Sequence, residues 1–282
     1  MNLQSTARCH DGDGLDEVSM NTPICPEDLV TCQSPNPNAR LRIFCFSFAG
    51  GGASAFNAWV DELPYDVRLQ AELCAIQLPG RETNIKAPPY TSISPLLDAL
   101  APVIGCDRST PFAFVGHSMG ALISFELARQ LRRERRRGPT HIVVSGHRAP
   151  QLPDRQPPIH RLPDQEFMAS LRIFGGTPES VLQNSELMDL FLPVLRADFA
   201  VCENYVYANE EALSCSITAF GGNDDGRVSR EELSAWRSQT CSSFSMHMFP
   251  GDHFFIQSAQ VLVLRVLAQD LKQVLRRLPS AM

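Results

Sequence analysis

The pentapeptide GHSMG at residues 116–120 constrains the fold of this chain more than any other feature. It follows an apolar run at residues 112–115 and precedes a segment with helical spacing that continues to about residue 133. A serine on a tight turn between a buried strand and a helix projects its hydroxyl above a sheet, beside the positive end of that helix. Glycines at both ends are needed because side chains there would collide within the turn. The pattern predicts a nucleophile at Ser118.

Apolar runs and helical patterns alternate along the chain. Strand-like runs lie at residues 41–46, 73–78, 112–115, 142–145, 216–220 and 244–249, and helical patterns at about 56–63, 94–104, 120–133 and 259–275. Strands that are continuously apolar are typical of a parallel sheet covered on both faces. We therefore expect an α/β fold with a mostly parallel central sheet and helices on both faces.

One long stretch, at about residues 150–212, interrupts this alternation. It carries several helical patterns, so we interpret it as a helical lid inserted over the carboxyl edge of the sheet. One of its patterns places apolar residues at helical spacing, which either pack in a core or line an acyl channel. These residues are Leu187, Leu190, Phe191, Val194 and Leu195.

The first 39 residues lack periodicity and are rich in Asp, Asn, Pro and Ser. This composition predicts a flexible N-terminal extension, or alternatively an arm that binds a partner, ahead of one domain at residues 40–282. The chain has 282 residues and a formal net charge of -6, which argues against general nucleic-acid binding. No apolar run reaches the roughly 18 residues of a membrane span, and no secretory signal is visible, so we expect no membrane partner.

The nine cysteines are odd in number, are scattered and form no CxxC pair. Cys45 and Cys74 lie inside apolar strand-like runs. We therefore expect reduced thiols in a cytoplasmic protein. The seven histidines do not follow zinc-binding spacings, so we expect no metal and no cofactor.

A serine nucleophile needs a base, and in this architecture a histidine follows the acid late in the chain. His253 fits, because it lies in the loop FPGDHFF between the last strand and the last helix. His247 lies inside a predicted strand, where we expect a structural role. His141 is expected at the surface, at the start of a strand. His117 neighbours the serine but its side chain is expected to point elsewhere.

The third member of a triad orients the imidazole and stabilises its cation. Asp224 and Asp225 both follow the strand at 216–220, at the edge of the sheet where such an acid belongs, and spacing alone does not separate them. Asp252 adjoins the histidine and is not expected to reach back to Nδ1. Asp198 lies in the predicted lid.

Acyl transfer also needs donors for the developing oxyanion. The residue after the nucleophile, Met119, supplies one backbone N–H, and the glycine-rich loop after the first strand supplies another, for which Ala49 is the candidate. The same loop loosely matches a dinucleotide-binding fingerprint. A dinucleotide-binding site, however, requires an acidic residue after the next strand. This chain has Gln77, Leu78 and Pro79 there, which argues against nucleotide binding.

A basic run at residues 132–137 closes the helix that follows the serine. Cations suit the negative end of a helix, so we interpret it as a solvated helix end. A contact for an acidic carrier protein is the alternative.

Seven ordered blocks resemble the stand-alone type II thioesterases of nonribosomal peptide and polyketide synthesis, within the α/β-hydrolases. They are FCFSFAGGGAS at 44–54, IQLPGRE at 76–82, FVGHSMGALISFELAR at 114–129, VSGHRAPQLP at 144–153, LPVLRADFAVCENY at 192–205, ITAFGGNDD at 217–225 and FPGDHFF at 249–255. Ser118, Asp225 and His253 match the triad positions of this family, and Ala49 and Met119 match its oxyanion positions. Ser47-Phe48 replaces the more usual Pro-Tyr, and His147 stands where arginine is common.

The resemblance implies an α/β-hydrolase that hydrolyses acyl thioesters from the phosphopantetheine arm of carrier proteins and clears stalled or mis-primed acyl groups. It implies a cytoplasmic enzyme without metal or cofactor, and we expect a monomer. Product release, acyl transfer and general esterase activity use the same triad and are the alternatives. A carrier-binding module without catalysis is the alternative of a different class.

Overall fold

The computed structural model describes residues 26–104 and 109–279 of the chain, and these form a seven-stranded sheet in the order β1-β3-β2-β4-β5-β6-β7. Strands β2 to β7 run parallel, and only β1 pairs antiparallel, with β3. The strands are β1 (Val30–Thr31), β2 (Leu41–Phe46), β3 (Ala71–Ile76), β4 (Phe112–His117), β5 (His141–Ser145), β6 (Ser216–Gly222) and β7 (Phe244–Phe249). The predicted mostly parallel sheet is confirmed, and β2 and β7 have the predicted bounds.

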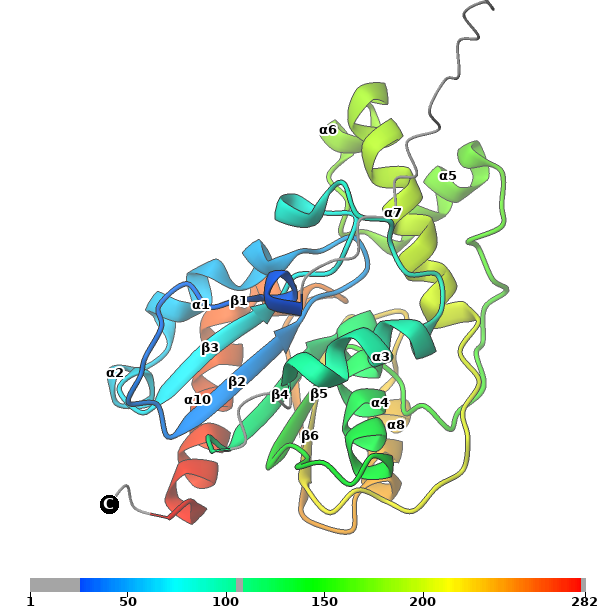
Figure 1. Ribbon diagram of the computed structural model, residues 1–282. Helices are drawn as coiled ribbons and strands as arrows, with labels where there is room; N and C mark the ends of the chain where they lie inside the picture. Colours follow the sequence, from blue (N-terminus) through cyan, green and yellow to red (C-terminus); the bar gives the residue numbers. More distant parts are fainter. Residues whose placement is uncertain (1–25, 105–108, 280–282) are drawn as a thin grey trace, which may run out of the picture.

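Helices cover both faces of this sheet (Figure 1). Helices α3 (Ile93–Ile104), α4 (Met119–Arg133) and α8 (Arg230–Ser234) lie on one face, and α1 (Asn57–Glu62), α2 (Tyr65–Arg68) and α10 (Gln260–Arg277) on the other. The short helices η2 (Ala53–Phe56), η3 (Glu82–Asn84), η4 (Ala235–Gln239) and α9 (Phe255–Ser258) complete the connections. Among the described helices, none has both the length and the apolar character needed to cross a bilayer.

Two hydrophobic cores separate these layers, because successive side chains of a strand point to opposite faces. In β2, Phe44 and Phe46 pack in the core beneath α3 and α4, while Ile43 and Cys45 pack in the core beneath α10. Both sets are at most 3 % exposed. The continuous apolar run of the strand is therefore explained by burial on both faces.

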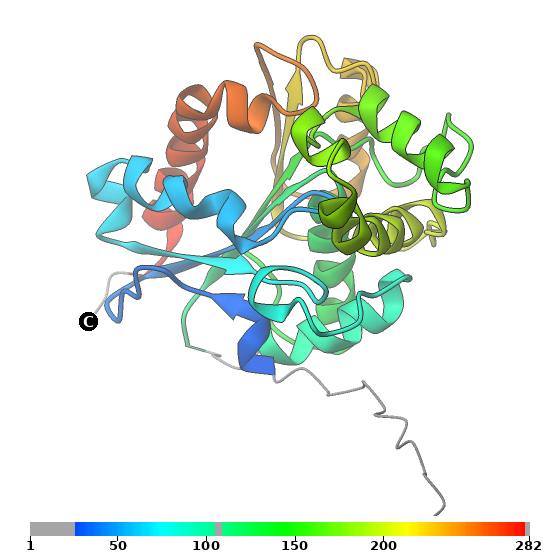
Figure 2. The same cartoon turned by 90° about the horizontal axis from the view of Figure 1, so that it is seen from above.

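The cap is formed by α5 (Asp164–Phe174), α6 (Glu179–Leu182) and α7 (Ser185–Glu203), which lie between β5 and β6 in sequence. These helices gather over one end of the sheet, as the view from above shows (Figure 2). They have a small core of their own, in which Phe167, Leu171, Met188 and Phe199 take part. The predicted helical insertion is confirmed as a set of helices at this position.

Ordered structure begins before residue 40, where we placed the start of the domain. The helix η1 (Pro26–Leu29) and the strand β1 come earlier, and the pairs Val30–Ile76 and Thr31–Ala75 attach β1 to the edge of the sheet. Residues 26–39 therefore do not form the flexible extension that we predicted for them. Residues 1–25 lie outside the described part of the chain.

The prediction that the cysteines are reduced is wrong for one pair. Cys32 and Cys74 form a disulfide across 42 residues, because Cys32, just after β1, lies against Cys74 of β3. Cys45, Cys202, Cys215 and Cys241 are free thiols. The cysteines therefore no longer support the cytoplasmic location that we inferred from them, and this location stays a prediction.

The position of His141 also differs from its prediction. We expected this residue at the surface, but its side chain is buried and its Nδ1 lies 2.7 Å from the Ser216 hydroxyl of the neighbouring strand. The reason is that β5 is a central strand, so that even its first residue is covered.

Candidate active site

Ser118 lies on a strained turn between β4 and α4. Its φ of 53° and ψ of -116° are a backbone conformation that few non-glycine residues adopt, and strain of this kind concentrates at functional sites. Its N–H donates to the Ser145 carbonyl at 2.7 Å. A Cβ at Gly116 would come within 2.1 Å of the Gly120 carbonyl oxygen, and one at Gly120 within 2.1 Å of the Phe46 carbonyl oxygen. The two glycines therefore permit the tight turn that presents the serine.

The structure brings together Ser118, His253 and Asp225, which we predicted from separate segments. His253 Nε2 lies 3.1 Å from Ser118 Oγ, and His253 Nδ1 lies 2.8 Å from Asp225 Oδ2. The histidine follows β7 and the aspartate follows β6, so both loops leave the carboxyl edge of the sheet. An ionised carboxylate only accepts hydrogen bonds, so Nδ1 carries the proton and Nε2 is left to accept one from the serine.

The environment of Asp225 favours its charged form. Burial opposes ionisation, but the hydrogen bond and charge of His253 and two backbone N–H groups outweigh it, so the pKa of Asp225 lies below its usual value. Those N–H groups belong to Arg227, at 2.8 Å, and Val228, at 3.3 Å. The aspartate thus enters the site as a fixed anion behind the histidine ring.

The competing acids lie elsewhere. Asp224 is exposed and contacts the Gly251 carbonyl through its backbone N–H. Asp252 accepts the N–H of Phe254 at 2.8 Å. Asp225 is the acid that meets His253, so the alternative that spacing left open is decided by geometry.

His117 packs beneath the catalytic candidates without joining them. Its side chain is fully buried, its Nδ1 lies 2.9 Å from the Ser145 hydroxyl, and its ring centroid is 5.2 Å from that of His253. Burial, together with the charge of His253, holds the pKa of His117 well below its usual value. The ring is therefore neutral packing under His253.

Ala49 and Met119 both line the cavity that contains Ser118 and His253. Met119 is the first residue of α4, so its N–H has no acceptor within the helix. Ala49 belongs to the glycine-rich loop after β2. The two residues thus lie beside the serine in the wall of the same cavity, and their role as oxyanion donors stays a prediction.

The loop that carries Ala49 is anchored by a residue whose role the sequence did not reveal. Asp198 of the cap helix α7 accepts the N–H of Gly50 at 2.7 Å. The same carboxylate receives two hydrogen bonds from Arg81, at 2.7 and 2.8 Å. Further along the loop, the N–H of Ala53 donates to the Gln77 side chain at 2.8 Å. Asp198 is one of four acidic residues of α7, and nothing in the sequence distinguishes it from the others.

The cavity beside Ser118 has a volume of about 160 Å³. Cavities of about 150 Å³ admit molecules of the size of benzene, so the space suits a short acyl group. Phe174 and Phe199 of the cap form an aromatic part of its wall, with ring centroids 5.8 Å apart. Arg227 also lines it.

The apolar stripe of α7 divides between the two roles that we considered. Val194 and Leu195 are buried, and Leu195 also lines a second, smaller cavity beside Ser118. Leu187 and Leu190 lie nearer the start of the helix and are 37 % and 48 % exposed. Only the later part of the stripe, at Val194 and Leu195, is therefore fully buried, and within it Leu195 reaches the cavity.

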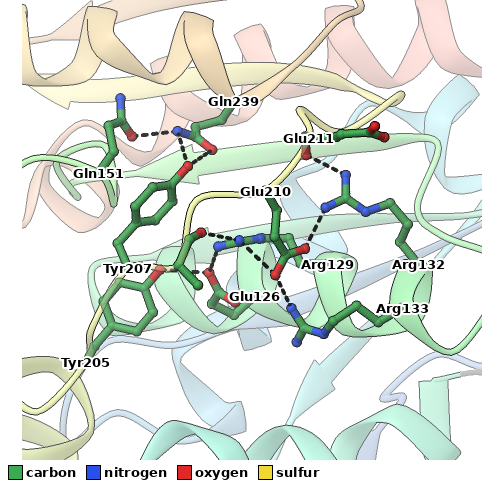
Figure 3. A network of polar contacts seen from close by, with 11 residues as sticks. Glu126, Arg129, Arg132, Arg133, Gln151, Tyr205, Tyr207, Glu210, Glu211 and Gln239 are labelled. Carbon is green, nitrogen blue, oxygen red and sulfur yellow. Dashed lines mark hydrogen bonds and ion pairs between the residues drawn. The ribbon is translucent and has the colours of Figure 1, made fainter.

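The basic run that closes α4 is partly engaged in ion pairs (Figure 3). Arg132 and Arg133 contact Glu210, at 2.7 and 2.8 Å, and Glu210 lies in the segment that leads from α7 to β6. Arg129, one turn earlier, is buried and bridges Glu126 at 2.6 Å and Glu210 at 2.9 Å. The run is thus more than a solvated helix end, because it holds this segment to α4.

One group of potential metal ligands lies close together in the described part of the chain: Cys32, Glu72 and Cys74. Its two sulfur atoms form the disulfide, and Glu72 is paired with Arg42 at 2.7 Å. As they stand, these side chains do not make a ligand set.

A parallel sheet with a serine turn after β4, a histidine after β7, an acid after β6 and a helical cap defines an α/β-hydrolase. The model of the thioesterase domain family matches residues 41–271. The chain belongs to the thioesterase domain family, and it is a hydrolase of the serine-dependent, thioester-cleaving kind that we predicted.

Two curated proteins of known name are similar to this chain over most of its length. The gramicidin S biosynthesis protein GrsT of Aneurinibacillus migulanus is 47 % identical over 240 residues, which cover 85 % of this chain and 92 % of that protein. The thioesterase PikA5 of Streptomyces venezuelae is 36 % identical over 79 % of this chain and 78 % of its own length.

Solved structures agree with these relatives. The type II thioesterase BorB from the borrelidin biosynthetic cluster superposes with a TM-score of 0.77 at 31 % identity, covering 89 % of this chain and all of its own. The thioesterase RedJ from the prodiginine pathway of Streptomyces coelicolor gives 0.76 at 34 % identity, over 83 % of this chain and 92 % of its own. The resemblance to stand-alone type II thioesterases is confirmed.

Proposed function

We propose that the chain hydrolyses acyl thioesters held on the phosphopantetheine arm of carrier proteins and so removes stalled or mis-primed acyl groups from a synthase. The observation that carries the proposal is the chain of hydrogen bonds from Ser118 through His253 to Asp225, at 3.1 and 2.8 Å, beside a cavity that suits a short acyl group. The similarity to type II thioesterases of nonribosomal peptide and polyketide pathways supports the carrier-bound substrate.

The first half of the reaction forms an acyl-enzyme. His253 Nε2 takes the proton of Ser118 while Oγ attacks the thioester carbonyl carbon. Asp225 stabilises the imidazolium through Nδ1, and the N–H groups of Ala49 and Met119 bind the oxyanion. The C–S bond then breaks, and the thiol of the carrier arm leaves with the proton from Nε2.

The second half releases the acyl group. A water molecule gives its proton to His253 Nε2 and attacks the ester carbonyl on Ser118. The same donors stabilise the second oxyanion, and the proton returns to Ser118 Oγ as the free acid leaves. The balance is one thioester and one water giving one acid and one thiol.

An editing enzyme acts on small groups that block a carrier. The aromatic wall of Phe174 and Phe199 and the volume of about 160 Å³ support a short acyl chain. We propose a carrier protein as the partner, and the monomeric state of the enzyme stays a prediction.

Intact-protein mass spectrometry of acyl-loaded carrier proteins tests this function. With the wild-type enzyme we expect loss of the acyl mass from the carrier and a transient acyl adduct on Ser118. The variant Ser118→Ala is expected to leave the carrier acylated and to form no adduct. Ser234→Ala is the matched control, since within the described part of the chain this hydroxyl donates to the Glu231 carbonyl of its own helix, α8.

Three results would contradict the proposal. An acyl adduct that persists in Ser118→Ala rules out the nucleophile. A loaded carrier that stays intact with the wild-type enzyme rules out the substrate class. Oxygen esters that are cleaved as fast as the matching thioesters indicate a general esterase instead.

A further inference from the structure

Gln77 bridges two loops at the carboxyl edge of the sheet. It directly follows β3, and it is 1 % exposed. Its side-chain carbonyl accepts the N–H of Ala53, in the glycine-rich loop after β2, at 2.8 Å. Its side-chain nitrogen donates to the backbone carbonyl of Arg81, in the loop after β3, also at 2.8 Å. The loop that carries Ala49 is therefore tied to the loop that carries Arg81 through one buried side chain.

The two partners of Gln77 suit a side-chain amide. The Ala53 N–H needs an acceptor and the Arg81 carbonyl needs a donor, and an amide offers one of each on neighbouring atoms. A carboxylate at this position would turn an oxygen toward the Arg81 carbonyl. An apolar side chain would leave both backbone groups buried without a partner.

The main chain of Gln77 is fixed as well. Its N–H donates to the Leu29 carbonyl at 2.9 Å, and its carbonyl accepts the side chain of Asn84 at 3.2 Å. The side chain thus extends from a backbone that is held on two sides. A side chain fixed in this way holds its partners in place instead of following their movements.

The glycine-rich loop is attached at two further points. The N–H of Gly50 donates to Asp198 at 2.7 Å, and the carbonyl of Gly51 accepts from Arg81 at 3.2 Å. The bond to Gln77 is the attachment at the other end of the loop, where η2 begins. The loop is therefore held near both of its ends.

These contacts also account for the partial match of this loop to a dinucleotide-binding fingerprint. In a dinucleotide site, an acid follows the next strand, and N–H groups at the start of the helix bind phosphate. Here Gln77 stands in place of the acid and turns toward the loop. The N–H groups of Gly50, Ala53 and Ser54 already donate to side chains. The same backbone shape therefore serves to hold the loop rigid.

This inference rests on the proposed function. We propose that Gln77 is a positioning residue for the oxyanion hole. Through the Ala53 N–H it fixes the loop from which the Ala49 N–H reaches the oxyanion. Gln77 does not line the cavity that contains Ser118, so it acts through the loop and not on the substrate. A misplacement of about 1 Å in such a group costs roughly 100-fold in rate.

The variant Gln77→Met tests the proposal on an acyl thioester of N-acetylcysteamine. Methionine has a similar length but replaces the amide by a weak acceptor. We expect kcat to fall about 10- to 100-fold, because an oxyanion donor is displaced and not removed. KM is expected to change by less than about threefold, since the donor acts mainly in the transition state. Steady-state kinetics measures both, with circular dichroism to verify folding.

A trifluoromethyl ketone analogue of the same thioester gives a second readout. Ser118 Oγ adds to its carbonyl carbon, the electron pair of the C=O bond moves to the oxygen, and the serine proton goes to His253 Nε2. The resulting oxyanion uses the same donors. The inhibition constant Ki is therefore expected to rise in Gln77→Met by the factor by which kcat/KM falls. A residue with a structural role only would lower stability and leave the Ki of the folded enzyme unchanged.

Gln239→Met is the matched control, because Gln239 is also a buried amide with two side-chain partners but does not line the cavity with Ser118. It is 6 % exposed, and its side-chain nitrogen donates to Gln151 at 2.7 Å and to Tyr207 at 3.2 Å (Figure 3). We expect a comparable loss of stability, with kcat and Ki at the wild-type values. An equal fall of kcat in this variant would attribute the effect to lost stability and overturn the proposal.

Two results in folded Gln77→Met would also overturn it: an unchanged kcat, or a lower kcat with an unchanged Ki. If Gln77→Met does not fold, Gln77→Glu is measured against the same two criteria, since it keeps the acceptor and loses the donor. Failure of the wild-type enzyme on every thioester contradicts the proposed function itself. Hydrolysis at the full rate by the Gln77 variants contradicts only this inference.

Discussion

Arg81 and Asp198 are 117 residues apart in sequence and form a buried, doubly hydrogen-bonded ion pair, with N–O distances of 2.7 and 2.8 Å. Each side chain is 3 % exposed. The same carboxylate accepts the N–H of Gly50, the neighbour of Ala49. The pair thus joins the cap helix α7 to the loop that presents the proposed oxyanion donor.

We predict that Asp198→Asn lowers both stability and catalysis. Breaking a buried pair leaves Arg81 without its counter-charge and costs about 3–5 kcal/mol of the free energy of unfolding. Loosening of the Gly50 N–H displaces an oxyanion donor, whose loss usually costs about 100- to 1000-fold in kcat. Chemical denaturation and steady-state kinetics measure the two effects.

The double variant Arg81→Met with Asp198→Leu separates positioning from stability. An apolar replacement of a buried ion pair often restores stability, so we expect a denaturation midpoint near that of the wild type. The Gly50 N–H still lacks its acceptor, so kcat is expected to stay at least about tenfold low with a smaller change in KM. If kcat recovered together with stability, the ion pair of Arg81 and Asp198 would have a structural role only and would not position the loop for catalysis.

The two neighbouring aspartates are predicted to differ sharply. Asp225→Asn removes the anion that holds His253 in its productive tautomer, and a loss of about 10⁴-fold in kcat is expected. Asp224→Asn changes an exposed side chain, and kcat is expected to stay within about twofold. Thioester hydrolysis by both purified variants, with circular dichroism to verify folding, checks the contrast. Similar rates in the two would contradict the assignment.

The contacts between α4 and the segment before β6 give a stability prediction. Arg129→Met leaves the buried Glu126 with only the Tyr205 hydroxyl as a partner, at 2.7 Å (Figure 3). An uncompensated buried charge of this kind costs about 3–5 kcal/mol. Arg133→Met, whose side chain is 45 % exposed, is the control, and a change below about 1 kcal/mol is expected. If urea denaturation showed equal losses of unfolding free energy in the two variants, burial of the arginine would not determine how much its ion pair stabilises the fold.

A pH dependence of stability follows from His117. Its pKa in the folded chain lies well below the 6.5 of the unfolded chain, because the ring is buried. Above pH 6.5 both states are neutral and this group has no effect; below it, the unfolded chain binds a proton that the folded chain does not. Below pH 6.5, the free energy of unfolding therefore falls by about 1.4 kcal/mol for each unit by which the pH is lowered, because the unfolded chain binds one proton more than the folded chain.

The variant His117→Gln isolates the contribution of this histidine to the pH dependence of the free energy of unfolding. Its denaturation profile between about pH 7.5 and pH 5 is expected to be flatter than that of the wild type by the slope of one proton, even if the variant is less stable throughout. Parallel profiles would contradict the low pKa of this ring.

Local sequence signals predicted those parts that local geometry determines. The GHSMG turn, the order of strands and helices, and the loops that carry Asp225 and His253 all follow from residues close in sequence. The two-residue strand β1 has no pattern of its own and exists because it pairs with β3, so the sequence did not reveal it. The disulfide of Cys32 follows from that pairing and was missed for the same reason.

The side chains that act through tertiary packing were equally hidden. Asp198 was placed in the cap, but its partners depend on how α7 crosses the loop after β2. His141 was assigned to the surface, because a strand start is usually exposed and the covering of a central strand is not a local property. Contacts between segments more than 100 residues apart, such as that of Arg81 with Asp198, need the fold to be known first.

The anchoring of Gly50 by a cap residue links substrate access to reactivity. A shift of α7 large enough to break a 2.7 Å hydrogen bond also frees the loop that holds the Ala49 N–H. The position of the proposed oxyanion donor therefore depends on where α7 lies. One carboxylate, that of Asp198, couples the cap mechanically to the loop beside the reacting serine.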